Sequence, residues 1–253
     1  MTETLVAVHH DAGVRTLTLN SPANRNALSA RLLDQLAAAL RDATADGEVR
    51  VVVLTGSGTV FCSGADLSER GSGAPNRMPE ILTAIRESPV PVLARVNGHA
   101  RAGGLCLIAV CDLAVAPAGA TFAFTEVRVG VAPAMILVPA LRVVDPRFLT
   151  RAVLTGESFG AAEAAVAGLL SAVVDDEAAL DAWVADVTTA LRKGAPGAVQ
   201  ATKELARSLP ALSWADGMAA AAARSAELFG GPEAAEGMAA FLEKRRPSWD
   251  TAS

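Results

Sequence analysis

The segment Val49–Leu54 constrains the fold most, because it is a nearly continuous apolar run rich in β-branched residues. Such a run is typical of a strand that is buried on both faces, in a parallel sheet covered by helices. The preceding segment has Ser29 as a candidate N-cap, followed by apolar residues at helical spacing, namely Leu32, Leu36, Leu40 and Ala43. With Val14–Leu19 predicted as an earlier strand, the order strand, helix, strand indicates a βα crossover unit and an α/β fold.

The rest of the first 195 residues continues this alternation. Further strands are predicted over Leu5–Val8, Pro89–Val96, Leu113–Ala116, Thr121–Phe124 and Leu170–Val174. Helices are predicted over Leu105–Val110, Arg147–Leu154 and Ala161–Gly168, and from a cap at Asp175 or Asp176 to Lys193. Thr55–Gly64 and residues 68–79 are rich in turn residues, so we expect loops there.

The pattern changes near residue 195. Residues 196–246 contain no convincing strand, only helical periods interrupted by prolines and glycines. We therefore expect residues 1–195 to form an α/β core and residues 196–253 to form an all-helical C-terminal region. The apolar side chains of that region can be buried against partner chains or within one subunit, and they include Met218, Met238, Phe241 and Leu242.

The composition limits the classes of partner. Hydrophobic residues make up 51% and charged residues 19% of the 253-residue chain, and the net charge is −5. These values are typical of a globular protein. They argue against nucleic acid as the main partner, because phosphate binding needs a basic surface. The apolar run Leu105–Val110 is too short to span a bilayer, and no signal-peptide pattern precedes the first strand, so we expect a cytoplasmic protein.

The sequence also argues against several bound groups. Three cysteines, an odd number without a framework spacing, predict free thiols in a reducing compartment. No Cys–His cluster has the spacing of zinc ligands, so no metal site is predicted. There is neither a P-loop nor a G-x-G-x-x-G turn after a strand, so neither ATP nor NAD is expected.

Five segments carry short motifs, in order and nearly from end to end of the chain. They are Asn20–Leu28 (NSPANRNAL), Phe61–Leu67 (FCSGADL), Gly98–Asp112 (GHARAGGLCLIAVCD), Phe124–Gly130 (FTEVRVG) and Glu236–Arg245 (EGMAAFLEKR). Together they resemble the enoyl-CoA hydratase/isomerase (crotonase) family. The resemblance implies a spiral of βα repeats, with C-terminal helices that pack into a homotrimer or a hexamer. It also implies an acyl-CoA substrate, with no cofactor besides the coenzyme A that the substrate carries.

The resemblance implies that the backbone N–H groups of Ala65 and Gly103 hold the thioester oxygen. Gly64 permits a sharp turn before Ala65, and a helix that begins at Gly103 points free N–H groups and its positive dipole end outward. One donor aimed at a developing oxyanion contributes about 3–4 kcal/mol. The alternative is that these glycines only form tight turns.

Glu126 is the expected acid/base. It is the only acidic residue between Asp112 and Asp145, and it follows the apolar run Phe122–Phe124. A carboxyl group in apolar surroundings has a raised pKa and can exchange protons near neutral pH. The alternatives are a salt bridge to Arg128 or a solvated loop position.

The coenzyme A moiety is expected to contact one loop region and two tail residues. By resemblance, the first set is Arg25, Ala27, Ser63, Gly64, Ala65, Asp66, Leu67 and Gly103. The Arg25 guanidinium matches phosphate geometry, although it can also be a solvated loop residue. Phe229 and Lys244 resemble tail residues that reach coenzyme A, in the same chain or in a neighbouring subunit. Lys244 can instead be a favourable charge at a helix C-terminus.

Two departures from the family affect the expected reaction. Family hydratases typically have a first glutamate three residues after the oxyanion glycine, where this chain has Cys106. With an ordinary pKa of about 8.5, a thiol is a weak acid for this role. It is interpreted as a small core residue or as a reactive thiol. The second departure is Val131–Ile136, which places a bulkier apolar wall after the glutamate segment.

Three candidate functions remain, and they are ranked by resemblance and by the chemistry of a single glutamate. Phe124–Gly130 and the tail most resemble the hydratase branch, so an enoyl-CoA hydratase is expected first. A site with one glutamate suits Δ3,Δ2-enoyl-CoA isomerisation on chemical grounds, because one base can move a proton between two carbons. A non-catalytic acyl-CoA-binding family member is the third alternative, and retention of Glu126 argues against it.

Overall fold

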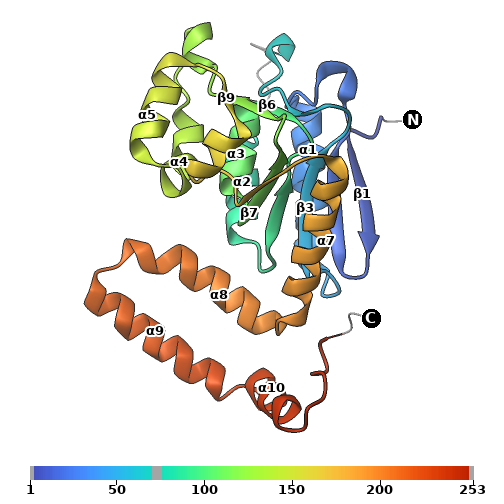
Figure 1. The fold of residues 1–253 in the computed structure, drawn as a ribbon, viewed down its shortest axis with the longest axis vertical. Helices are drawn as coiled ribbons and strands as arrows, with labels where there is room; N and C mark the ends of the chain where they lie inside the picture. Colours follow the sequence, from blue (N-terminus) through green and yellow to red (C-terminus); the bar gives the residue numbers. More distant parts are fainter. Residues whose placement is uncertain (1–2, 70–75, 251–253) are drawn as a thin grey trace.

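The structure of the chain is a computed structural model that describes residues 3–69 and 76–250. Its larger sheet has six strands in the order β1-β2-β3-β5-β7-β10 (Figure 1). All its strand pairs are parallel except β1 with β2. The strands are β1 (Val6–Asp11), β2 (Val14–Leu19), β3 (Val51–Gly56), β5 (Val92–Arg95), β7 (Leu113–Pro117) and β10 (Ala172–Val174). The predicted α/β fold is confirmed.

The smaller sheet has four short strands in the order β4-β6-β8-β9. They are β4 (Val60–Cys62), β6 (His99–Arg101), β8 (Thr121–Ala123) and β9 (Phe159–Gly160), and only the last pair is antiparallel. Along the chain, β3, β5 and β7 of the larger sheet are each followed by a strand of the smaller sheet. The repeating unit is therefore two strands and a helix, in place of the predicted strand and helix.

The helices of the core cover both faces of the larger sheet. They are α1 (Ala30–Ala45), α2 (Met78–Glu87), α3 (Gly103–Val110), α4 (Ala134–Val143), α5 (Pro146–Thr155), α6 (Ala161–Val166) and α7 (Glu177–Lys193). Every residue of β3 is buried, as predicted. Because side chains alternate along a strand, Val52 and Leu54 pack with α1, whereas Val51 and Val53 pack against α7.

Two helix starts follow directly from the sequence. The Ser29 side chain accepts a hydrogen bond from Leu32 N at 3.2 Å, and Asp176 caps α7 in the same way by accepting from Ala179 N at 2.9 Å. The residues predicted to form the buried face of α1 are fully buried, namely Leu32, Leu36, Leu40 and Ala43. Both helix predictions are confirmed.

The C-terminal region contains α8 (Pro196–Ser208), α9 (Trp214–Phe229) and α10 (Pro232–Leu242), with a 3-10 turn at Leu209–Ala211. In Figure 1 these helices lie beside the core at the end of the molecule away from β6 and β9. Helix α9, which is described in full, contains no buried residue. Met218, Met238, Phe241 and Leu242 are all exposed, so burial within one subunit is not their role. Whether residues 196–253 form a separate domain stays a prediction.

Some predicted loops contain regular structure. Strand β4 lies within the predicted loop Thr55–Gly64, and neither β6 nor α4 was predicted. The predicted loop 68–79 begins inside a 3-10 turn (Leu67–Glu69), and α2 begins near its end, at Met78. Residues 70–75 lie outside the described residues. Strands of three residues are too short for a period of two to be recognised.

Candidate active site

Three neighbouring strands of the smaller sheet end at the predicted site residues. Strand β4 is followed by Ser63, Gly64 and Ala65, β6 by Ala102 and Gly103, and β8 leads within three residues to Glu126. These strands are parallel and adjacent, in the order β4-β6-β8, so their carboxyl ends lie at one edge of the sheet. Parallel sheets bind ligands at this edge. The structure therefore brings the predicted oxyanion donors and the predicted base together.

The Ala65 N–H is free to bind a ligand. Leu28 forms a parallel bridge with Ala65 by donating to Gly64 O at 2.8 Å and accepting from Asp66 N at 3.3 Å. In a parallel bridge these two bonds leave the N–H of the middle residue pointing the other way. No described residue accepts a hydrogen bond from Ala65 N, and Ala65 is exposed.

The Gly103 N–H lies close to the same place. Gly103 is the first residue of α3, where an N–H group has no partner within the helix, and no described residue accepts from it. A β-carbon built on Gly103 would lie 3.9 Å from Ala65 N, and one built on Gly64 would lie 3.4 Å from Gly103 N. The two N–H groups are therefore neighbours, and both belong to backbone held by hydrogen bonds or by a helix.

Glycine is required at two positions of this turn region. Gly64 has a φ of +94°, in the left-handed region that favours glycine. A β-carbon on Gly104 would lie 2.8 Å from Cys62 O and 2.9 Å from Cys62 Cβ, which is too close for any side chain. The first turn of α3 thus approaches the backbone after β4 directly, so the glycines do more than form tight turns.

Ala102 carries backbone strain directly before Gly103. Its φ is +49° and its ψ is −121°, a conformation that is costly for a residue with a β-carbon. Its N–H donates to Ala123 O at 3.0 Å, which fixes the end of β6 to the end of β8. The strain sits between the oxyanion donor and the strand that leads to Glu126.

Glu126 has the surroundings that an acid/base requires. It begins a 3-10 turn (Glu126–Val129) and is half-buried, and its Oε2 atom is buried with no hydrogen-bond partner among the described residues. Burial raises the pKa of the carboxyl group, opposed by a hydrogen bond to its own backbone. The predicted alternative of a salt bridge to Arg128 is wrong, because the Arg128 Nε donates to Thr155 O at 3.2 Å. The described chain thus leaves the hydrogen-bonding capacity of this carboxylate oxygen unused.

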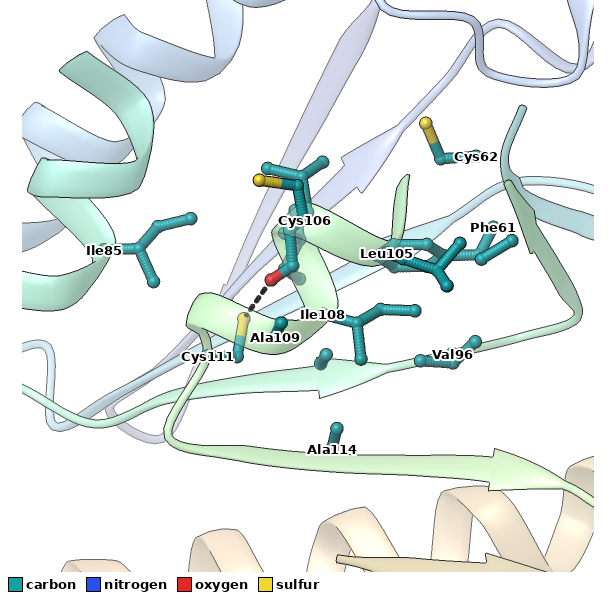
Figure 2. Close-up of a cluster of buried hydrophobic side chains, with 14 of the residues drawn as sticks. Phe61, Cys62, Ile85, Val96, Leu105, Cys106, Ile108, Ala109, Cys111 and Ala114 are labelled. Carbon is teal, nitrogen blue, oxygen red and sulfur yellow. Dashed lines mark hydrogen bonds between the residues drawn. The ribbon is translucent and has the colours of Figure 1, made fainter. Parts of the chain in front are cut away.

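Cys106 lies beside Glu126 as a neutral thiol. Burial, and next the negative charge of Glu126, raise the pKa of the thiol to about 12. Its Sγ contacts Met135 O at 3.8 Å, in the first turn of α4. Figure 2 shows Cys106 on the side of α3 opposite the strand that carries Ala114. The thiol therefore forms part of the wall beside Glu126, as Val131–Ile136 was expected to do, and its raised pKa keeps it protonated near neutral pH.

The residues expected to bind coenzyme A divide into two groups. Ser63 N donates to Arg25 O at 3.1 Å, so Arg25, the buried Ala27 and the segment Ser63–Leu67 form one surface beside Ala65. Arg25 is exposed, and Asp66 accepts hydrogen bonds from Ser68. Phe229 is the last residue of α9, and Lys244 follows α10. Both helices lie on the side of the molecule away from β6 (Figure 1). A single chain does not bring these two residues to the site.

Asn26 supports the site and was not singled out from the sequence. It is fully buried with a φ of +54°, in the left-handed region. Its side chain accepts from Ser21 N at 2.9 Å and donates to Ser57 O at 3.0 Å and Val60 O at 2.8 Å. It thereby ties the loop that carries Arg25 to strand β4. Asparagine tolerates this backbone conformation better than most residues do. That preference is the sequence signal by which Asn26 could have been recognised.

The described residues contain neither a candidate metal cluster nor a candidate membrane span. Within residues 3–69 and 76–250, no group of three or more His, Cys, Asp or Glu side chains is placed to hold a metal ion. None of the helices in these ranges is both long and apolar enough to cross a bilayer. All three cysteines are free, as predicted, and all three are buried.

Several known proteins are similar to this chain over nearly its whole length. The family model for "Enoyl-CoA hydratase/isomerase" matches residues 9–252. A Thermus thermophilus protein named "Putative enoyl-CoA hydratase" is 37% identical over 92% of this chain and 96% of its own length. The 2,3-dehydroadipyl-CoA hydratase of Escherichia coli is 33% identical over 93% of this chain and 94% of its own length. A crystal structure of enoyl-CoA hydratase from Mycobacterium smegmatis is 37% identical with a TM-score of 0.92, over 98% of this chain and 100% of that one.

Proposed function

Because the chain belongs to the enoyl-CoA hydratase/isomerase family and has its crotonase fold, we propose that it hydrates an enoyl-CoA thioester with Glu126 as the only acid/base. The observation that carries this proposal is the buried Oε2 of Glu126, which has no partner among the described residues. It lies at the strand edge that also presents two free N–H groups. Relatives named as hydratases support the same reaction.

The proposed reaction needs no group beyond these. The thioester oxygen accepts hydrogen bonds from Ala65 N and Gly103 N. Glu126 takes a proton from water as the water oxygen bonds to the β-carbon, and the electron pair of the double bond moves to the thioester oxygen. The resulting enolate is stabilised by the two donors, by about 3–4 kcal/mol each. Glu126 then gives the proton to the α-carbon, which completes a syn addition.

The Cys106 thiol favours isomerisation as a second candidate. With a pKa near 12, it remains neutral and cannot supply the second carboxylate that commonly orients water. Moving a double bond needs one base that removes a proton from one carbon and returns it to another. Glu126 beside an apolar wall meets that requirement. Both candidates use the same donors and the same base, so they differ only in whether water joins the substrate.

Binding of the substrate and assembly of the chain belong to the same proposal. Arg25, Ala27 and Ser63–Leu67 hold the coenzyme A moiety, and no other cofactor takes part. Trp214 and Phe241 are 85% and 83% exposed on helices that bury almost nothing, and apolar surface of this kind needs a protein cover. A homotrimer or hexamer provides it, and a neighbouring chain then brings Phe229 and Lys244 to coenzyme A. The cytoplasmic location stays a prediction.

The test is the absorbance of the conjugated enoyl thioester when the protein meets crotonyl-CoA. Hydration removes the conjugation, and Glu126→Gln should slow the loss by about 10²–10⁴-fold, because an amide cannot exchange the proton. If crotonyl-CoA is unchanged but a 3-enoyl-CoA gains conjugation through Glu126, the isomerase is the function. If Glu126→Gln leaves both reactions at the wild-type rate, Glu126 is not the base. Absence of both reactions, with acyl-CoA still bound, supports the non-catalytic alternative.

A further inference from the structure

The segment that carries the Ala65 N–H is paired with the backbone before α1 over a very short length. Leu28 N donates to Gly64 O at 2.8 Å, and Asp66 N donates to Leu28 O at 3.3 Å. This single bridge sets the direction of the Ala65 N–H. The chain then enters the 3-10 turn Leu67–Glu69, and no further backbone hydrogen bond between described residues continues the pairing.

A side chain continues this pairing where the backbone leaves it. Ala30 N donates to Glu69 Oε2 at 2.7 Å, across 39 positions of sequence. Ala30 is the first residue of α1, so its N–H has no partner within the helix and lies at the positive end of the helix dipole. Hydrogen bonds to a charged acceptor are short and strong. Glu69 N in turn donates to Asp66 O at 3.3 Å, which connects the turn to the residue next to Ala65.

Helix α1 has a separate N-cap of its own. The Ser29 side chain accepts from Leu32 N at 3.2 Å, which is the ordinary capping bond of a helix. Glu69 reaches the same helix start from the other segment, and it is half-buried there. The contact of Glu69 with Ala30 N therefore anchors the segment after β4 to the helix, in addition to satisfying a donor of the helix.

We propose that Glu69 is a positioning residue, which holds the Ala65 N–H at the distance and direction that a thioester oxygen requires. Glu69 is not one of the groups that meet the substrate in the proposed reaction. It acts through the 3-10 turn and the Leu28 bridge, between the end of β4 and the start of α1. The inference rests on the proposed function, because it takes Ala65 as an oxyanion donor. A displacement of about 1 Å from the productive position can cost about 10²-fold in rate.

The test is the carbon NMR chemical shift of butyryl-CoA, isotopically labelled at the thioester carbonyl and bound to the full-length protein. Butyryl-CoA is saturated, so the measurement needs no turnover. Two donors on the thioester oxygen polarise the carbonyl, so the wild type should move its resonance to higher ppm than in free butyryl-CoA. Glu69→Ala should lose about half of this change, because one donor of the two is misplaced. Glu69→Gln keeps an acceptor oxygen of similar reach and should retain most of the change.

Turnover provides a second readout, and another helix cap provides the matched control. Hydration of crotonyl-CoA should be about tenfold slower in Glu69→Ala than in the wild type. Asp176 accepts from Ala179 N at 2.9 Å and caps α7, on the opposite face of the larger sheet from α1. Asp176→Ala should destabilise the fold to a similar extent as Glu69→Ala. It should change neither the carbonyl resonance nor the rate.

Three results would overturn the proposal. An equal carbonyl resonance in the wild type and Glu69→Ala would overturn it alone and leave Ala65 as a donor. A wild-type resonance equal to that of free butyryl-CoA would overturn the donor assignment and this proposal with it. An equal loss in Asp176→Ala would show that lower stability, and not the Glu69 contact, displaces the donor. If Glu69→Ala does not fold, Glu69→Asp serves in its place, because its shorter side chain keeps the charge but does not reach Ala30 N.

Discussion

Lys203 on α8 and Asp112 after α3 form an ion pair of 2.7 Å that joins the C-terminal region to the core. The same ammonium group donates to Ile85 O and Val90 O, each at 3.1 Å, and its side chain is only 7% exposed. Lys203→Met leaves Asp112 and both carbonyl groups without this partner. It should lower the free energy of unfolding by about 3 kcal/mol, measured by denaturant titration. Lys193→Met, at an exposed position, is the control and should change stability by less than about 0.5 kcal/mol.

Glu126 should make the protein less stable at neutral pH than a neutral residue would. Its pKa is raised from 4.5 in the folded state, so the folded protein binds the proton more tightly than the unfolded chain does. Ionisation therefore costs stability above the raised pKa, and this cost disappears as the pH falls through that pKa toward 4.5. Glu126→Gln should have a higher melting temperature than the wild type at pH 8 and an equal one at pH 4. A lower melting temperature at pH 8 would contradict the burial argument.

Ala102→Gly should stabilise the fold. The alanine is held at a φ of +49°, and such strain costs about 1–3 kcal/mol. Glycine relieves the strain but loses about 0.5–1 kcal/mol in chain entropy, so the net gain is about 1 kcal/mol. Denaturant unfolding measures it. Ala100→Gly, two residues earlier, within β6 and fully buried, is the matched control and should destabilise instead.

Cys106→Glu should increase the hydration of crotonyl-CoA relative to isomerisation of a 3-enoyl-CoA. It places a second carboxylate beside Glu126, where it can orient water. Like charges at this distance raise the pKa of one group, so one carboxyl stays protonated near neutral pH. The ratio of the two rates is the measurement. Cys106→Gln is the control, because glutamine has a similar shape without the charge. An equal ratio of hydration to isomerisation in both variants would mean that charge at this position does not select the reaction.

The cysteines should react slowly with alkylating agents while the protein is folded. Burial raises the pKa of Cys62 and of Cys106 to about 12, and that of Cys111 is also raised. At pH 8 a thiol with such a pKa is ionised at only about one part in 10⁴. Mass spectrometry after iodoacetamide treatment should find no alkylation in buffer and alkylation of all three residues in denaturant. Rapid native labelling of Cys106 would instead identify it as a reactive thiol.

The long elements could be predicted from the sequence because their patterns repeat. Helix α1 shows four buried residues at helical spacing, and β3 is a run of apolar residues that the structure buries completely. The resemblance also implied that Ala65, Gly103 and Glu126 share one site; they lie at one edge of the smaller sheet, and their roles stay predictions. This prediction rested on the motifs that resemble the family, because no local sequence pattern shows that three separate segments lie side by side.

Other features depend on tertiary contacts that no local pattern records. Strands β4 and β6 have three residues each, and their pairing with one another defines them. The φ of Ala102 follows from the approach of Gly64, on which a β-carbon would lie 2.8 Å from Ala102 Cβ. The contacts of α8 with the end of α2 are of the same kind, since Lys203 donates to Ile85 O and Arg207 donates to Arg86 O. These contacts join residues that are distant in the sequence.

The proposed donors and the proposed base lie at the ends of three separate strands, and this allows the parts of the site to change independently. The segment after β8 can gain or lose an acid while the N–H groups after β4 and β6 keep their positions, because backbone supplies them and the glycines that shape this backbone lie in other segments. A lineage that replaces Glu126 would keep the capacity to polarise a thioester. Under the proposed function, binding of the carbonyl oxygen and transfer of the proton are thus separable properties of the fold.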